Sequence, residues 1–291
     1  PPTQESKDMI ETADQLRTII TKYTSSNESV EIWVMPEAII RLGGTPLVIT
    51  GFNMAMQSEG VATIDAEGLS SILVSRSERV ELHSLVLQNG RGTVSVEPGT
   101  TAGGVRVDHG VLRMANCTIS NCTATSPGSG KSQQGVFDTG GGLLVESGLL
   151  ILSSSVVEYC KASTAVGAGG GLCVGPNGRA IVTGCSLRNN EGTASGLVGG
   201  ALFSDGGIVA LSHCTIAGSL ASSESGLGAG GLCVLGGLTT FVHVKVASCN
   251  ASATSGNSVA GGVSLQAQAH VTFKLSLIVT CSAAASTHAA G

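Results

Sequence analysis

Two stretches of the chain carry an acidic residue at the same distance behind a pair of glycines. In GGVRVDH the acid is Asp108, with Arg106 and His109 beside it, and in GGLLVE it is Glu146. Two carboxylates about 5 Å apart can serve a retaining glycosidase. Together with an arginine base they can also bind Ca²⁺ in a lyase. Arg106, Asp108 and Glu146 are therefore the candidate catalytic residues, if the fold brings the two stretches together.

The glycine pairs mark an internal repeat. An aliphatic residue follows two small residues six times, and these first landmarks lie 38, 29, 30, 30 and 31 residues apart. A second aliphatic landmark, three residues before Asn, Cys or Ser, follows each first one by 14 or 15 residues. The first landmarks are Val105, Leu143, Leu172, Leu202, Leu232 and Val263, and the second are Ile119, Val157, Leu187, Ile216, Val246 and Ile278. A constant half and a variable half in each copy are typical of solenoid coils.

The repeat predicts an all-β fold, a right-handed parallel β-helix with about 30 residues per coil. In one coil we expect strands at 172–174, 180–182 and 185–187, each paired in parallel with its neighbours about 4.8 Å away. We expect the glycine pair to form a tight corner that favours positive φ or lacks room for a Cβ. A phosphate-binding loop is disfavoured, because a strand pattern and not a helix follows the glycines.

The chain is predicted to form one continuous domain with two parts. Residues 1–69 form a cap with the first strands, and residues 70–291 form the coils. Apolar residues from Met9 to Tyr23 fall at helical spacing, which predicts an amphipathic helix with Ser6 as its N-cap. Such a helix covers the unpaired edge of the first coil. No equivalent cap is visible at the other end, so we expect a protein partner or further chain to cover the C-terminal coil.

Composition narrows the functional classes. The net charge is −5 and no basic stripe is present, so there is no electrostatic footprint for nucleic acid. No apolar run reaches the roughly 18 residues that a membrane span needs. Residues 1–100 hold 13 of the 20 acids, whereas residues 229–291 hold none. Only 3% of residues are aromatic, which argues against subsites that stack on sugars.

Cysteines fall into rows when the coils are stacked. The predicted cysteine ladder pairs equal offsets in neighbouring coils: Cys122 with Cys160, Cys249 with Cys281, and Cys185 with Cys214. Buried reduced thiols and disulfides both remain open, because the Cα spacing suits a disulfide whereas parallel side chains place the Cβ atoms somewhat too far apart. Nine cysteines leave at least one unpaired within the chain.

Histidines form a shorter row. His213 and His243 share an outward offset in consecutive coils, but no third ligand lies at a neighbouring offset. No Cys-x-x-Cys pair is present for zinc either. We therefore predict no metal site and no cofactor.

Four sequons are candidate glycosylation sites: Asn27, Asn116, Asn121 and Asn250. They favour a secreted or cell-surface location.

The motifs GGLL, GGLC and GGVS, together with LRNN and VLQN, resemble the paired GGA[ILV] and FxxN repeats of chlamydial polymorphic outer membrane proteins. The helix followed by short strands is similar to the pectin lyase-like group of right-handed parallel β-helices. The likeness covers about residues 70–291 for the repeats and the whole chain for the fold. Here an aliphatic residue replaces the Phe throughout, and Cys replaces the Asn in four copies. The resemblance implies surface adhesion.

We therefore expect a non-catalytic structural or adhesive module, at a surface or within a larger protein assembly. Two alternatives remain. One is a polysaccharide lyase, epimerase or hydrolase that acts on acidic glycans through Arg106, Asp108 and Glu146. The other is a carbohydrate-binding module without turnover. The simplest interpretation of the acids is that they solvate the turn after the first strand of a coil.

Overall fold

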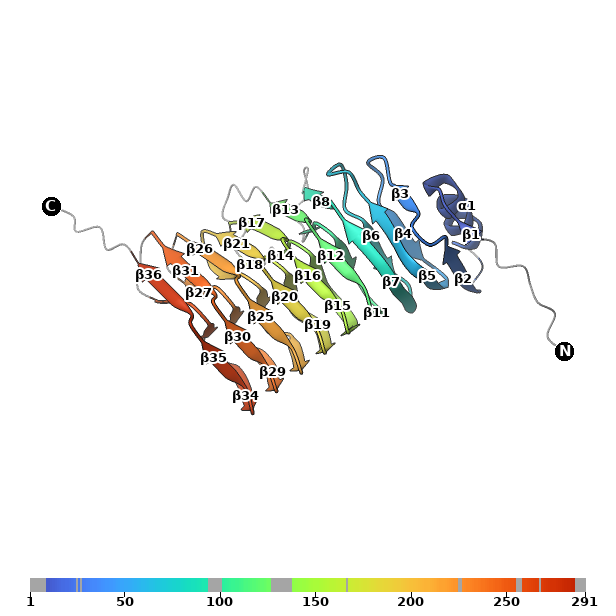
Figure 1. The fold of residues 1–291 in the computed structure, drawn as a ribbon. Helices are drawn as coiled ribbons and strands as arrows, with labels where there is room; N and C mark the ends of the chain where they lie inside the picture. The colour runs from blue at the N-terminus through green and yellow to red at the C-terminus, as the bar shows by residue number, and fades with distance from the viewer. Residues whose placement is uncertain are drawn as a thin grey trace.

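The computed structural model describes residues 9–24, 26, 28–93, 101–126, 138–165, 167–224, 227–254, 258–266 and 268–285. Over these residues the chain forms a parallel β-solenoid of about 7 turns, about 30 residues apart, with one helix at its N-terminal end (Figure 1). The predicted all-β class, the coil length and the N-terminal helix are confirmed. The helix α1 has 11 residues, and no helix of the described part is long and apolar enough to cross a membrane.

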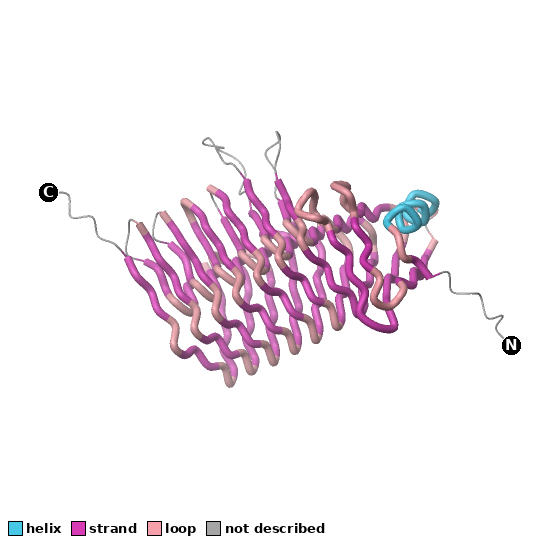
Figure 2. Tube along the Cα trace, turned by 45° about the horizontal axis from the view of Figure 1, so that its top comes forward, coloured by secondary structure: helices cyan, strands magenta, loops and turns pink. Residues whose placement is uncertain are grey.

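Three parallel sheets run along the stack, and Figure 2 shows their strands side by side from coil to coil. The large sheet begins with β1 (Met9–Ile10), β2 (Ser29–Val34), β3 (Ile39–Arg41), β4 (Leu47–Thr50), β5 (Asn53–Asp65), β6 (Leu73–Arg76) and β7 (Arg79–Gln88). It continues with β10 (Val105–Val107), β11 (Val111–Ala115), β12 (Thr118–Ser120), β15 (Leu143–Ser153), β16 (Val156–Glu158), β19 (Leu172–Thr183), β20 (Ser186–Arg188), β23 (Leu202–Ser204), β24 (Ile208–Ser212), β25 (Thr215–Ala217), β28 (Leu232–Val234), β29 (Gly237–Val242), β30 (Lys245–Ala247), β33 (Val263–Leu265), β34 (Ala269–Lys274) and β35 (Leu277–Val279).

Two smaller sheets run along the coils from residue 91 onward. The second sheet contains β8 (Arg91–Thr93), β13 (Thr123–Ser126), β17 (Lys161–Thr164), β21 (Glu191–Ala194), β26 (Leu220–Ser223), β31 (Asn250–Ala253) and β36 (Ser282–Ala285). The third contains β9 (Thr101–Ala102), β14 (Asp138–Gly140), β18 (Gly167–Gly169), β22 (Leu197–Gly199), β27 (Leu227–Ala229) and β32 (Ser258–Ala260).

The repeat landmarks are direct partners in the large sheet. Val105 pairs with Leu143, and each later first landmark pairs with the next. The second landmarks pair in the same way, from Ile119 and Val157 onward. All these residues are buried except Val263 and Ile278 in the last coil. The inward rows therefore form one continuous core, which extends from Ile10 to Cys249 without a break at residue 69.

Glycine is needed at the glycine pairs of the repeat because neighbouring backbone lies too close to leave room for a side chain, and not because the backbone adopts positive φ. None of these glycines adopts positive φ, so that part of the expectation was wrong. A Cβ on Gly141 would lie 2.1 Å from the carbonyl oxygen of Gly170 and 2.6 Å from the backbone of Lys161. Because the strand that carries Lys161 packs directly on this corner, only glycine fits there.

The helix begins later than predicted. Met9 and Ile10 form strand β1, which pairs with β2, and α1 spans Ala13–Tyr23. Ser6 lies outside the described residues, and the N-cap is Thr12, whose side chain accepts from Gln15 in a capping box. Helix α1 buries Leu16 and Ile20 in the core at the N-terminal end of the stack.

Each coil contains more strand than predicted. Residues 172–183 form one strand, β19, where two separate strands were expected, and the next strand begins at Ser186 and not at Cys185. The second and third sheets were not predicted at all. They pack against each other through small residues such as Ala162 and Ala194 of the second sheet and Ala168 of the third, which produce no aliphatic alternation in the sequence.

The last coil exposes residues whose equivalents are buried elsewhere. Leu265 is 48% exposed, Phe273 43% and Ile278 47%. A partner over this coil remains a prediction.

Candidate functional site

The candidate catalytic residues lie together where the chain turns from the first strand of a coil to the second. Arg106 is the middle residue of β10, Asp108 follows β10, and Glu146 lies on β15 in the next coil. Arg106 donates hydrogen bonds through Nε to Asp108 Oδ1 and through Nη2 to Glu146 Oε2. The side chains are 26%, 13% and 41% exposed, respectively. The register thus places the guanidinium between the two carboxylates.

A fourth member of this cluster was missed in the sequence. Arg76 Nε donates to Asp108 Oδ2 at 2.7 Å. Arg76 comes three residues after Leu73, and Leu73 pairs with Val105, so Arg76 has the same offset as Asp108. Extending the row one coil toward the N-terminus would have found it. The resulting ion-pair chain, Arg76–Asp108–Arg106–Glu146, alternates in charge across three coils.

A pocket of about 340 Å³ opens beside the ion-pair chain. It spans the same turn in three successive coils and is lined by Gly51, Phe52, Asn53, Arg76, Ser77, Glu78 and His109. The hydroxyl of Ser77 is buried and has no hydrogen-bond partner within the described part of the chain. A guanidinium, an imidazole, a carboxylate and an amide around one pocket can hydrogen-bond a polar ligand.

The rest of the acidic row does not extend the site. Its next positions are Gly175, Asp205, Leu235 and Gln266. Asp205 is only 8% exposed, so the expectation that this offset points to solvent was wrong there. Leu235, the equivalent residue in the following coil, packs against a cluster that contains Phe203. Burial raises the pKa of the Asp205 carboxyl.

The predicted cysteines line two inner corners of the coil. The first corner row contains Leu85, Cys117, Ser155, Cys185, Cys214, Val244 and Ser276, and the second contains Gly90, Cys122, Cys160, Asn190, Ser219, Cys249 and Cys281. The preceding residue in both rows adopts the left-handed conformation, for example Asn116 and Asn189. All nine cysteines have free thiols, and only Cys281 is partly exposed.

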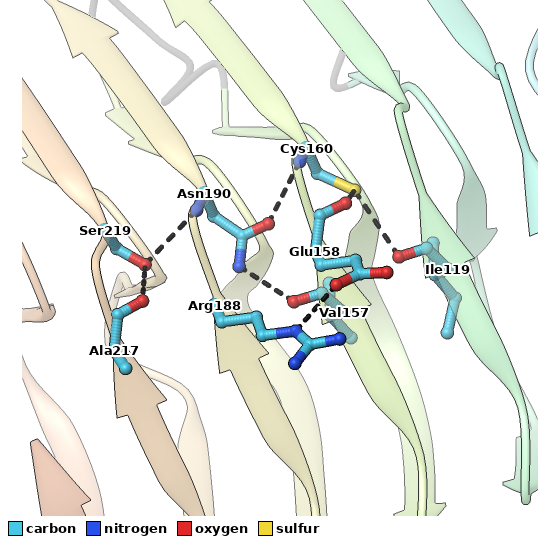
Figure 3. Close-up of polar contacts among 8 residues, drawn as sticks. All are labelled: Ile119, Val157, Glu158, Cys160, Arg188, Asn190, Ala217 and Ser219. Atoms are coloured by element: carbon cyan, nitrogen blue, oxygen red, sulfur yellow. Dashed lines mark hydrogen bonds and ion pairs between the residues drawn. The ribbon is translucent and has the colours of Figure 1, made fainter.

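Asn190 illustrates how side chains of the second corner row form hydrogen bonds with neighbouring coils (Figure 3). Its Oδ1 accepts from the backbone N–H of Cys160 at 3.0 Å, and its Nδ2 donates to the carbonyl of Val157 at 3.0 Å. Its own N–H donates to Ser219 Oγ. The Cys160 thiol donates to the carbonyls of Glu158 and Ile119. Asn190 and Cys160 thus both donate to the carbonyl of the second landmark in the preceding coil, at a corner where the backbone hydrogen bonds between strands are interrupted.

Burial favours the protonated form of several of these thiols. It raises the pKa of Cys117 and of Cys249 to about 11. Burial, reinforced by the neighbouring thiol of Cys122, also raises the pKa of Cys160. The Cys185 thiol donates a hydrogen bond to the Cys214 sulfur. This bond, together with burial, raises the pKa of Cys185, and the same bond lowers the pKa of Cys214 to about 7. Protonated buried thiols donate hydrogen bonds and are poor nucleophiles.

The two histidines stack at the outer side of the first corner. The rings of His213 and His243 lie 4.9 Å apart at their centroids, with 17° between their planes. The lone pairs of nearly parallel rings lie in separate planes and do not converge on one ion. No group of three or more His, Cys, Asp or Glu side chains in the described ranges is arranged to hold a metal ion.

The sequons differ in their surroundings. Asn27 lies outside the described residues. Asn116 and Asn121 are exposed corner residues with φ of 53°. Asn250 is exposed, and its Oδ1 accepts from Ser282 Oγ at 2.6 Å. Glycosylation at these positions remains a prediction.

No protein-family model, curated protein or solved structure matches the chain. Functional conclusions therefore rest on the fold and on the contacts described above.

Proposed function

We propose that the protein is a non-catalytic structural or adhesive module, at a surface or within a larger assembly. The observation that carries the proposal is the position of Arg106 between Asp108 and Glu146. A retaining glycosidase needs one carboxylate to attack the sugar and the other to protonate the leaving group. The guanidinium occupies the space between the carboxylates and pairs with both. An arginine held in two ion pairs is equally ill suited to act as a base.

The same contacts suit a role in holding coils together. Adjacent coils of a parallel solenoid place equivalent residues about 4.8 Å apart, so identical charges in one row would repel. Arg106 lies between the two acids, Arg76 pairs with the other oxygen of Asp108, and these ion pairs join three coils. The ion-pair chain lies at the turn after the first strand of the coil, which we call the turn edge. The architecture thus explains its charges without a substrate.

The test is a turnover assay on a panel of polyuronates and other acidic glycans, with and without Ca²⁺. We expect no turnover that depends on Asp108. Activity that Asp108→Asn abolishes, while thermal unfolding shows an intact fold, would falsify the proposal. Cross-linking mass spectrometry on the protein in its native source supplies the positive arm, since a structural or adhesive module should cross-link to other chains.

A second candidate, a carbohydrate-binding module without turnover, is favoured by the pocket beside the ion-pair chain. Asn53 and His109 line this pocket and take no part in the ion pairs. Calorimetric titration with neutral and acidic oligosaccharides tests it. Saturable binding that survives Asp108→Asn but is lost in Asn53→Ala and His109→Ala would replace the purely structural role with a binding one.

A further inference from the structure

One outer corner of the C-terminal coils combines cations with exposed leucines. It lies between the second and third strands of the coil, where β29 leads to β30 and β34 leads to β35 (Figure 1). In the register, Lys245 pairs with Leu277 and Val242 pairs with Lys274. We call these residues the amphipathic corner: His213, His243, Lys245, Lys274, Leu275 and Leu277.

The cations of the amphipathic corner are not neutralised. Several lysines and arginines elsewhere pair with carboxylates on adjacent coils, as in the ion pairs Lys161–Glu191 and Arg188–Glu158. Glu224 is the last acidic residue of the sequence, so the following coils contain none. Within the described residues, neither Lys245 nor Lys274 makes an ion pair. The positive charge at this corner is therefore available to an external anion.

The leucines project from the same corner. Leu275 is 81% exposed and has φ of 48°, and Leu277 is 53% exposed. Left-handed backbone is unfavourable for leucine, whereas Asn, Ser, Gly and His occupy the equivalent position in other coils. Asn116 and His243 stay exposed in this row although coils flank them on both sides. The exposure of Leu275 therefore follows from its place on the corner and not from its place in the last coil.

We propose that the amphipathic corner docks on an anionic lipid surface. Lysine side chains next to anionic headgroups gain electrostatic energy. Protruding leucines beside them can enter the boundary between headgroups and acyl chains. A soluble polyanion would use the cations but would gain nothing from Leu275 and Leu277. A lipid surface uses both, and this combination decides between the two partners.

The inference goes beyond the proposed structural or adhesive role and does not depend on the turn edge around Arg106. The corner lies on another side of the coil from that edge, because the whole second strand separates them. Failure of lipid binding would thus leave the role of the turn edge intact, and glycan turnover would leave lipid binding intact.

The experiment is co-sedimentation of the full chain with vesicles of phosphatidylcholine alone or with added phosphatidylserine. We expect binding to the anionic vesicles only, weakened by salt. Lys245→Gln and Lys274→Gln should each weaken it about fivefold. Leu275→Asn with Leu277→Ser should weaken it at least tenfold. Asparagine suits the left-handed backbone at position 275, so this variant should remain folded.

Two variants serve as matched controls. Leu238→Ser removes a leucine that is 48% exposed on the outer face of β29, and Lys161→Gln removes a lysine from another side of the coil. Neither should change vesicle binding. A parallel titration with dextran sulfate separates lipid docking from general attraction to anions.

The outcomes are distinct. Loss of vesicle binding in the leucine variant, with unchanged dextran sulfate binding, supports lipid docking. Equal vesicle binding by the leucine variant and the parent overturns it and leaves a polyanion site. The absence of any preference for anionic vesicles also overturns it. Thermal unfolding of each variant excludes loss of the fold as the cause.

Discussion

The inner corner rows and the outer ion-pair chain both connect neighbouring coils through side chains, yet they differ in burial and charge. Asn190 is fully buried, and both ends of its amide satisfy backbone groups of the preceding coil. Arg106 is 26% exposed, and its partners are carboxylates that water and salt can reach. A neutral buried network is expensive to interrupt because it leaves polar groups unpaired. A partly exposed ion pair is less expensive to interrupt, because water can replace part of the interaction.

Replacing Asn190 should have the largest effect. Asn190→Ala leaves the Cys160 N–H and the Val157 carbonyl without partners in the core. We expect the free energy of unfolding to fall by about 2 to 4 kcal/mol, measured by urea denaturation.

Two variants sharpen this test. Asn190→Cys introduces the residue that occupies four other positions of the row and should lose less than the alanine variant. Asn189→Gly changes the exposed left-handed neighbour and should stay within about 0.5 kcal/mol of the parent. If all three variants unfold alike, the buried network is not a major source of stability.

The raised pKa of buried thiols in the inner rows predicts that the protein loses stability at alkaline pH. Burial raises the pKa of Cys117 from 9.0 to about 11, so the folded state keeps a proton that the unfolded state releases. The protonated Cys117 thiol makes its full contribution to the free energy of unfolding below about pH 9, and this contribution is lost as the pH rises toward 11. It amounts to about 2 to 3 kcal/mol, visible as a falling urea midpoint.

Cys117→Val provides the control for that titration. Valine occupies the equivalent position at Val244, so the substitution suits the row. The variant should lose less stability than the parent between pH 9 and 11. An identical slope would show that other groups cause the alkaline destabilisation.

The outer ion-pair chain should give the smallest effect. Arg106→Gln removes the central guanidinium and leaves two acids on adjacent coils. Because the groups are partly solvated, we expect a loss of no more than about 1 kcal/mol that shrinks in 1 M salt. Arg179→Gln, at an exposed position on the outer face of β19, is the matched control. A loss as large as that of Asn190→Ala would contradict the contrast between the two regions.

The sequence alone determined the solenoid, its coil length and the register of its main rows. Val105, Leu143 and Leu172 recur with a small-residue pair before them, and aliphatic residues at equal offsets must stack because they share one core. The same register brought Asp108 and Glu146 to neighbouring coils.

Only the tertiary structure decided what each row does. The sheets that contain Ala162 and Ala168 show no aliphatic alternation, because mutual packing of small residues defines them. Asp205 shares its offset with Asp108 but is buried, since its environment depends on the neighbouring coils and not on its own position in the repeat. The pairing of Arg76 with Asp108 likewise required the geometry of adjacent turns. Sequence periodicity specifies which residues become neighbours, whereas burial and charge pairing depend on everything that packs around them.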